Sequence, residues 1–236
     1  MTRIDRTLLA AAVLAAWVPA RAGDSPVPGM SWNRAMANKA FLSVTLLRNT
    51  LEGDLDGTLA LGTTEKVFYV PKLDPGLGLS IGYGRTLKTG VWMVNFTRSV
   101  HDASFRGTGS SASYNAVEFG GKGYLTTRAP FFPYLQVGFG VSSLHVNDAA
   151  ERGGKIYDAN YLGLSVNGGG GVLVPVGPRV FLTAAATYRF FAGMYAKGPG
   201  RARDVTNLYI DRTGPRRKIF LKIPGLRLEA GVGYFF

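Results

Sequence analysis

The sequence predicts an all-β protein, an eight-stranded antiparallel up-and-down β-barrel that spans a membrane. Three observations support this. Runs of about ten residues alternate large apolar with small or polar side chains, the first residues have the pattern of an export signal, and the breaks between runs are alternately short and long. The composition agrees, with 32 glycines and only 18% charged residues. The chain has no cysteine, which excludes disulfide frameworks and thiolate metal sites.

The first 22 residues have the features of a secretory signal peptide. Two arginines precede an apolar run over residues 8–18, and a small-x-small site ends at Ala22, after which cleavage is expected. The run is shorter than the roughly 20 apolar residues of a membrane-spanning helix. We therefore expect residues 1–22 to be a signal peptide, residues 23–38 a periplasmic lead-in and residues 39–236 the barrel.

Four strands are expected in the first half of the chain. Each places its large apolar side chains on one face, because successive side chains of a strand point to opposite sides. Leu79 and Tyr83 in the second run, Trp92 and Phe96 in the third and Phe119 in the fourth lie on that face. The runs cover residues 39–48, 77–84, 91–100 and 114–126.

The second half repeats the scheme with four more strands. Val137 and Phe139 represent the apolar face of the fifth, Val166 that of the sixth, and Tyr188 and Phe190 that of the seventh. The last strand closes the chain. These runs cover residues 135–142, 162–172, 180–190 and 227–236.

The connections alternate in length. Short turns are expected at residues 87–90, 126–130 and 176–179, and long loops at residues 49–72, 105–113, 147–160 and 194–225. This order predicts an up-and-down meander with both termini at the short-turn end.

The last long loop allows a second strand count. Residues 205–210 and 217–223 are expected to pair as a hairpin above the membrane. If they crossed it, the barrel would have ten strands, but they are shorter than the roughly 9 to 11 residues a crossing requires. The apolar residues occupy odd-numbered positions up to Leu221 and even-numbered positions from Leu226. This switch of face predicts a β-bulge at Pro224-Gly225.

The apolar face is predicted to point outward to lipid. In a soluble barrel this face would fill the interior and leave an exterior of glycine, serine and scattered charges. With the apolar face outward, the lumen receives a charge network whose opposite signs can pair. Its members are Glu118, Lys122, Arg189, Arg227 and Glu229.

The final strand resembles the C-terminal signature of Gram-negative outer-membrane β-barrels, in particular the small eight-stranded OmpA/OmpX-like class. The terminal Phe236 and the apolar residues before it at alternating positions, Tyr234, Val232, Ala230 and Leu228, carry the resemblance. It implies a bacterial outer-membrane location, long loops outside the cell and short turns in the periplasm. It also implies that Tyr234 and Phe236 form an assembly signal for the barrel-assembly machinery.

One constellation raises the question of catalysis. Ser143 and His145 share the outward face near the long-loop rim, and Asp158 follows across the next loop. Some outer-membrane lipid A deacylases resemble this in using a lipid-facing serine and histidine, but their motif is His-x-Ser and the order here is Ser-x-His. Rim residues that meet water or lipid head groups are the ordinary interpretation, so no enzyme activity is predicted. With only two histidines, His101 and His145, neither a metal nor a cofactor is expected.

The last long loop is strongly basic in a chain of formal net charge +12. Arginine and lysine there could bind the phosphates of lipopolysaccharide. Solvated loops without a specific ligand are the alternative, and no recognition motif for nucleic acid accompanies the charge. The basic residues are Lys197, Arg201, Arg203, Arg212, Arg216, Arg217, Lys218 and Lys222.

Three functions follow from this sequence. The first is a monomeric structural or interaction protein with a plugged polar lumen, whose loops contact lipopolysaccharide or external partners. The second is a narrow passive channel for small solutes, although eight-stranded barrels normally fill their own interior. The third is a lipid A-modifying hydrolase that uses Ser143 and His145.

Overall fold

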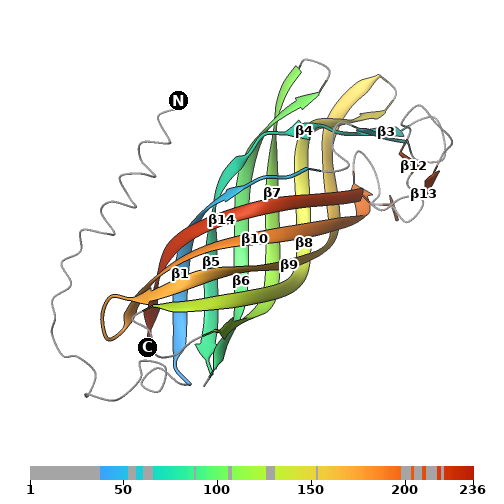
Figure 1. Cartoon of the computed structure of the whole chain (residues 1–236). Coiled ribbons are helices and arrows are strands. Elements are labelled where there is room, and N and C mark those ends of the chain that lie inside the picture. Colours follow the sequence, from blue (N-terminus) through green and yellow to red (C-terminus); the bar gives the residue numbers. More distant parts are fainter. Residues whose placement is uncertain are drawn as a thin grey trace.

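Eight long strands form a closed antiparallel barrel in the described part of the chain (Figure 1). The computed structural model describes residues 38–52, 57–60, 66–87, 89–105, 108–125, 131–152, 154–197, 203–204, 209–210, 217–218 and 221–236. The expected signal peptide lies outside these residues. The barrel strands are β1 (Ala40–Asn49), β5 (Gly76–Thr86), β6 (Gly90–Phe105), β7 (Thr108–Tyr124), β8 (Phe132–Arg152), β9 (Lys155–Pro175), β10 (Val180–Lys197) and β14 (Leu221–Phe235).

The ring closes between the first and the last strand. Each long strand pairs antiparallel with the next, and β14 returns to β1 in a register that runs from Phe41 opposite Phe235 to Asn49 opposite Arg227. Closure leaves no open sheet edge, which is the condition for a sheet to exist in hydrocarbon. The predicted eight-stranded meander is confirmed, and the ten-stranded alternative is wrong.

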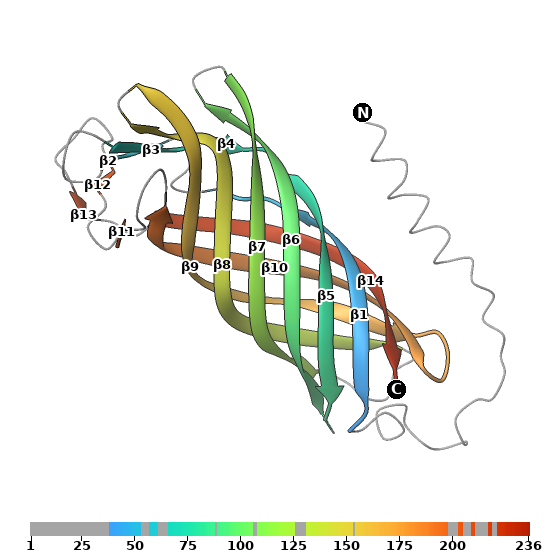
Figure 2. The same ribbon diagram turned by 180° about the vertical axis from the view of Figure 1, so that it is seen from behind.

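The two ends of the barrel differ. At the end that carries the C-terminus, here called the turn end, tight connections join β5 to β6 and β9 to β10. At the opposite end, the loop end, short segments cross and extend the barrel (Figure 2). These segments are β2 (Gly57–Ala60), β3 (Lys66–Val70), β4 (Lys72–Leu73), β11 (Arg203–Asp204), β12 (Tyr209–Ile210) and β13 (Arg217–Lys218).

The connection between β1 and β5 lies across the loop end. Its β3 segment pairs with β8 and its β4 segment pairs with β6, so one connection bridges two strands that are not neighbours in the ring. Further out, β12 pairs with both β2 and β13. The pairing of Tyr209 with Lys218 agrees with the hairpin expected in the last long loop.

Two expected loops are largely strand. The sequence predicts long loops at residues 105–113 and 147–160, but β6 and β7, and likewise β8 and β9, continue there as extended hairpins at the loop end (Figure 1). The prediction required large apolar residues on the outward face. In these extensions most outward residues are small or polar, such as Ser113, although Ile156 is an apolar exception that is 64% exposed, while inward ones such as Ala112 remain buried.

The bulge predicted at Pro224-Gly225 is absent from the pairing of β14 with β10, which is continuous from Leu221 to Tyr234. Leu221 and Ile223 point into the lumen and are fully buried, and Lys222 points outward. The prediction of a bulge is wrong because apolar side chains in this part of β14 do not face lipid. At the loop end, the lumen itself is apolar.

The apolar face points outward along the middle of the barrel, as predicted. Leu79 and Phe96 are each 50% exposed, whereas Ser80 and Thr97 on the other face are 4% and 0% exposed. Contacts between outward aromatic rings form a belt near the turn end, from Phe236 to Tyr83, Trp92, Phe119 and Phe139. Such girdles occur where a transmembrane barrel meets the membrane interface. Among the described residues, no helix is long and apolar enough to cross a membrane.

Candidate functional site

The lumen is the part of the molecule in which polar and charged side chains converge, and it has three layers. A polar middle layer lies between an apolar cluster at the turn end and a second one at the loop end. The turn-end cluster contains Phe41, Val91, Met93, Phe132, Tyr134, Leu173, Phe181 and Phe235. The loop-end cluster includes Leu51, Val70, Leu73, Tyr114, Leu144, Val146, Tyr161, Phe191, Leu221 and Ile223.

Glu118 is the centre of the polar layer. Its Oε2 atom lies 3.0 Å from Nη2 of Arg189 and 3.1 Å from Nη1 of Arg227. Arg227 also approaches Oε2 of Glu229 at 3.4 Å. The side chains of Glu118, Arg189 and Arg227 are at most 3% exposed, so each charge depends on its protein partners rather than on water.

Hydroxyl groups from neighbouring strands complete this network. Nε of Arg227 donates a hydrogen bond to Oγ1 of Thr187 over 3.1 Å, and Ser165 donates to Oε1 of Glu118 over 3.5 Å. The guanidinium carbon of Arg189 lies 4.7 Å from the centroid of the Tyr114 ring. Nε and Nη1 of Arg189 have no hydrogen-bond partner in the described structure. The same guanidinium makes a cation–π contact with the Tyr114 ring.

Lys122 stands apart from the other predicted lumen charges. Its Nζ atom donates to the Tyr134 hydroxyl over 3.3 Å and lies 4.5 Å from the centroid of the same ring. Within the described residues, no carboxylate lies within 4.0 Å of it. The structure thus brings four of the five predicted residues together, and the fifth pairs with a phenol instead.

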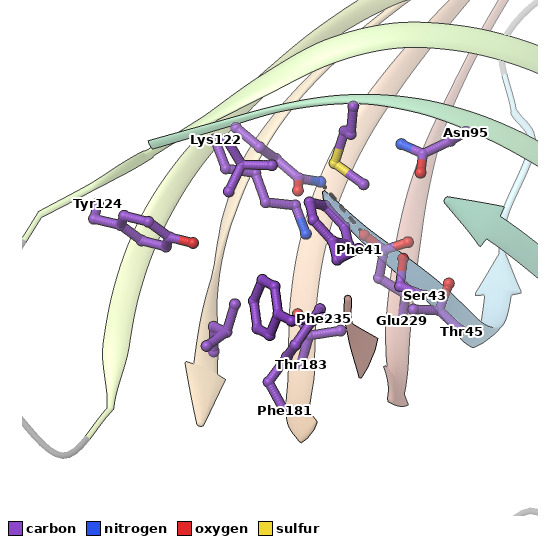
Figure 3. Close-up of a pocket in the computed structure, with 14 residues that line it drawn as sticks. Phe41, Ser43, Thr45, Asn95, Lys122, Tyr124, Phe181, Thr183, Glu229 and Phe235 are labelled. Carbon is purple, nitrogen blue, oxygen red and sulfur yellow. Dashed lines mark hydrogen bonds between the residues drawn. The ribbon is translucent and has the colours of Figure 1, made fainter. Parts of the chain in front are cut away.

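A small cavity of about 20 Å³ near the turn end is lined by Lys122 and by the aromatic residues of the turn-end cluster. Phe41, Phe181 and Phe235 form its floor (Figure 3). The three rings contact one another, with centroids 5.7 Å apart for Phe41 and Phe181, 5.8 Å for Phe41 and Phe235, and 4.8 Å for Phe181 and Phe235. We call these three residues the aromatic plug.

Glycine makes room for the aromatic plug. A Cβ atom on Gly84 would lie 2.7 Å from Cζ of Phe41, and one on Gly233 would overlap the ring of Phe181. The resemblance of the last strand implies an assembly signal at Tyr234 and Phe236 but gives no role to Phe235. The alternation of side chains along the strand indicates a role for Phe235 in the lumen, because it places Phe235 on the same inward face as Arg227 and Glu229.

The loop end is closed by residues from the wall and from the connection that crosses it. Val70 and Leu73 in this connection are 0% and 5% exposed, and they belong to the same cluster as Tyr161 and Leu221. His101 tethers the connection to the wall. Its ring nitrogens contact the carbonyl oxygen of Asp74 at 3.0 Å and the Ser99 hydroxyl at 2.9 Å.

The candidate catalytic residues lie on the outer surface, and their contacts do not form a serine–histidine pair. Nδ1 of His145 bonds to Oδ1 of Asn160 over 2.8 Å, and Nε2 lies 3.8 Å from Oδ2 of Asp158. No hydrogen bond joins Ser143 to His145 in the described structure. These contacts of His145 are thus with side chains of β9 and not with Ser143, whereas an activated serine would require a contact with the histidine.

The predicted basic loop residues are only partly within the described structure. Arg201, Arg212 and Arg216 lie outside it. For Lys197, Arg203, Arg217 and Lys218 the structure gives the strand position alone, and Lys222 is an exposed, outward residue of β14. The described residues contain no cluster of histidine, aspartate or glutamate suited to a metal ion.

The two residues of the expected assembly signal face outward at the turn end. Tyr234 and Phe236 are 45% and 59% exposed. Nη1 of Arg179, in the turn before β10, donates a hydrogen bond to the Tyr234 hydroxyl over 3.2 Å.

Comparison with known proteins identifies the fold. No protein-family model matches the sequence, and no curated protein does. Neisserial surface protein A has 15% sequence identity and a TM-score of 0.52, over 84% of this chain and 97% of that one. OprG from Pseudomonas aeruginosa has 11% identity and a TM-score of 0.49, over 85% of this chain and 97% of that one. The likeness to the neisserial protein shows that this chain has the fold of the small eight-stranded outer-membrane barrels, as the resemblance of the last strand predicted.

Proposed function

We propose that this protein is a monomeric outer-membrane barrel of structural or interaction type, with a closed lumen and basic loops that contact lipopolysaccharide or external partners. After removal of residues 1–22, the barrel-assembly machinery would insert it through the signal formed by Tyr234 and Phe236. The long loops would then lie outside the cell. The barrel fold, the outward apolar face and the export pattern support this location.

The observation that carries the proposal is the layered lumen. Any solute would have to displace the aromatic plug, the ion pairs of Glu118 and the loop-end cluster in succession. Arg189, Tyr161 and Leu221 are at most 1% exposed. This layering opposes transport, because opening a path through the polar layer would separate buried ion pairs and leave charges without a partner, which is costly.

Planar-bilayer recording tests the closed lumen against the alternative of a narrow passive channel. We expect purified, refolded protein to give no steady conductance at moderate voltage. A reproducible open channel of constant amplitude would favour the passive channel and contradict the plugged lumen. An unrelated refolded porin in the same bilayers is the positive control.

The hydrolase alternative has a direct test. We expect cells that express the wild-type protein or the Ser143→Ala variant to have identical lipid A profiles by mass spectrometry, because no hydrogen bond joins Ser143 to His145 in the described structure. A deacylated species that appears with the wild type and disappears with the variant would establish the enzyme instead.

A further inference from the structure

We infer that the outer wall of the barrel carries a binding site for the phosphate group of an anionic lipid, formed by Arg98 of β6, Asn115 of β7 and Ser143 of β8. This site is separate from the basic loops, and it rests on the proposed outer-membrane location. Figure 2 shows the three strands side by side. The pairing register sets Arg98 opposite Asn115 and Asn115 opposite Ser143, so the three residues form one row across the wall.

The row marks an abrupt change in the chemistry of the outward face. Two residues nearer the turn end, the corresponding row is entirely apolar. It consists of Phe96, Val117, Val141 and Leu164, which are 50%, 52%, 52% and 53% exposed. The step between the two rows is only about 6.6 Å, at roughly 3.3 Å per residue along a strand. Such a change is expected where acyl chains end and head groups begin.

The polar row is bounded on both sides. Leu79 of β5 pairs with Arg98, and Leu162 of β9 pairs with Ser143; these leucines are 50% and 45% exposed. In the next row towards the loop end, Ser113, His145 and Asn160 continue the polar surface on β7, β8 and β9, whereas β6 presents Val100, which is 53% exposed. The polar patch is therefore confined to a few strands and does not form a belt around the barrel.

The side chains of the row are unpartnered. In the described structure, Arg98, Asn115 and Ser143 have neither a hydrogen bond nor an ion pair with other side chains, and Arg98 is exposed. An arginine beside an apolar, lipid-facing row is costly unless its guanidinium reaches a polar partner. The carboxylate of Asp158 is occupied near His145, on β9, three strands from β6.

A lipid phosphate matches this arrangement. Arginine presents two parallel N–H groups to phosphate oxygens, and the asparagine amide and serine hydroxyl on the adjacent strands add further donors. Strands lie about 4.8 Å apart, so neighbouring side chains of the row can contact one head group. The apolar row beneath would hold the acyl chains of the same lipid. A free phosphate ion would contact only the polar row and would leave the apolar row uncovered.

The chain offers a matched control for Arg98. Arg48 of β1 also points outward, is exposed and has no partner in the described structure. Its neighbours in the sheet are Leu77 of β5 and Leu228 of β14, so no polar side chain lies beside it in its row. Removal of Arg48 changes the net charge by the same amount without affecting the polar row.

Native mass spectrometry of the detergent-folded full chain, titrated with diphosphorylated lipid A, tests the site. We expect Arg98→Gln to weaken binding about tenfold or more, as loss of a charge-assisted hydrogen bond implies. Asn115→Leu should weaken it severalfold, and Arg48→Gln less than twofold. Dephosphorylated lipid A should bind wild type and Arg98→Gln alike. Inorganic phosphate at the same concentration should not displace the phosphorylated lipid.

Three outcomes would overturn the site. They are equal losses for Arg98→Gln and Arg48→Gln, an unchanged affinity in Arg98→Gln, and displacement by free phosphate. All variants should retain the heat-dependent gel shift of a folded barrel, because the substituted side chains are on the outer surface. Steady conductance would contradict the closed-lumen proposal and leave this site intact. Binding of phosphorylated lipid that depends on the loop arginines and not on Arg98 would contradict this site alone.

Discussion

At the scale of single residues, Glu118 is the residue on which the lumen depends most. It is the shared partner of two arginines that water does not reach. Removal of one partner from a buried ion pair leaves an uncompensated charge, which costs more than the pair itself contributes. Glu229 offers the natural comparison, because its side chain is 10% exposed and contacts Arg227 alone among the described arginines.

We expect Glu118→Gln to lower the free energy of unfolding by about 3 to 5 kcal/mol. Glu229→Gln should lower it by less than half as much, because its partner Arg227 retains Glu118. Urea unfolding in phospholipid vesicles, followed by tryptophan fluorescence, measures both. Equal losses for the two variants would show that Glu118 is not the centre of the network.

At the scale of elements, the last strand has a different task on each face. Its inward face carries Arg227, Glu229 and Phe235 to the lumen, and its outward face carries Tyr234 and Phe236 to the girdle. It also closes the ring against β1. The two terminal phenylalanines are therefore not equivalent, although they are neighbours in the sequence.

This difference predicts opposite behaviour of two variants. Phe235→Ala should lower the stability of refolded protein by about 3 to 5 kcal/mol, because it empties part of the aromatic plug. Phe236→Ala should change it by less than about 1 kcal/mol, as expected for an exposed side chain, yet reduce the amount inserted in cells. Unfolding in vesicles and quantification of membrane fractions separate the two effects. A stability loss that is larger for Phe236→Ala would refute the assignment.

At the scale of the whole molecule, closure of the lumen is redundant. The aromatic plug blocks the turn end, and the loop-end cluster with its crossing connection blocks the other. Between them lies the ion-paired layer, anchored to three different strands. Loss of one layer should therefore leave the others in place.

We expect Phe181→Ala, which opens only the aromatic plug, to remain free of steady conductance in planar bilayers. The ion-paired layer and Tyr114, Tyr161 and Leu221, all at most 1% exposed, still fill the path. The gel shift of the folded barrel confirms that the sample is intact. If this variant conducted steadily, the aromatic plug would be the sole barrier and the loop end would be open.

The sequence by itself determined the strand order, the outward face and the residues of the central ion pairs. These properties follow from the period-two alternation of a strand and from the two solvents, lipid and lumen, on its faces. The sequence did not reveal the apolar layers at both ends of the lumen or the two extended hairpins, β6–β7 and β8–β9. It also did not reveal that the side chains of Leu221 and Ile223 point into the lumen. Only the tertiary structure decided these, because a side chain inside a closed barrel contacts strands that are distant in the sequence. Phe41 and Phe235 meet at the seam between the first and last strands, and local alternation carries no information on such a contact.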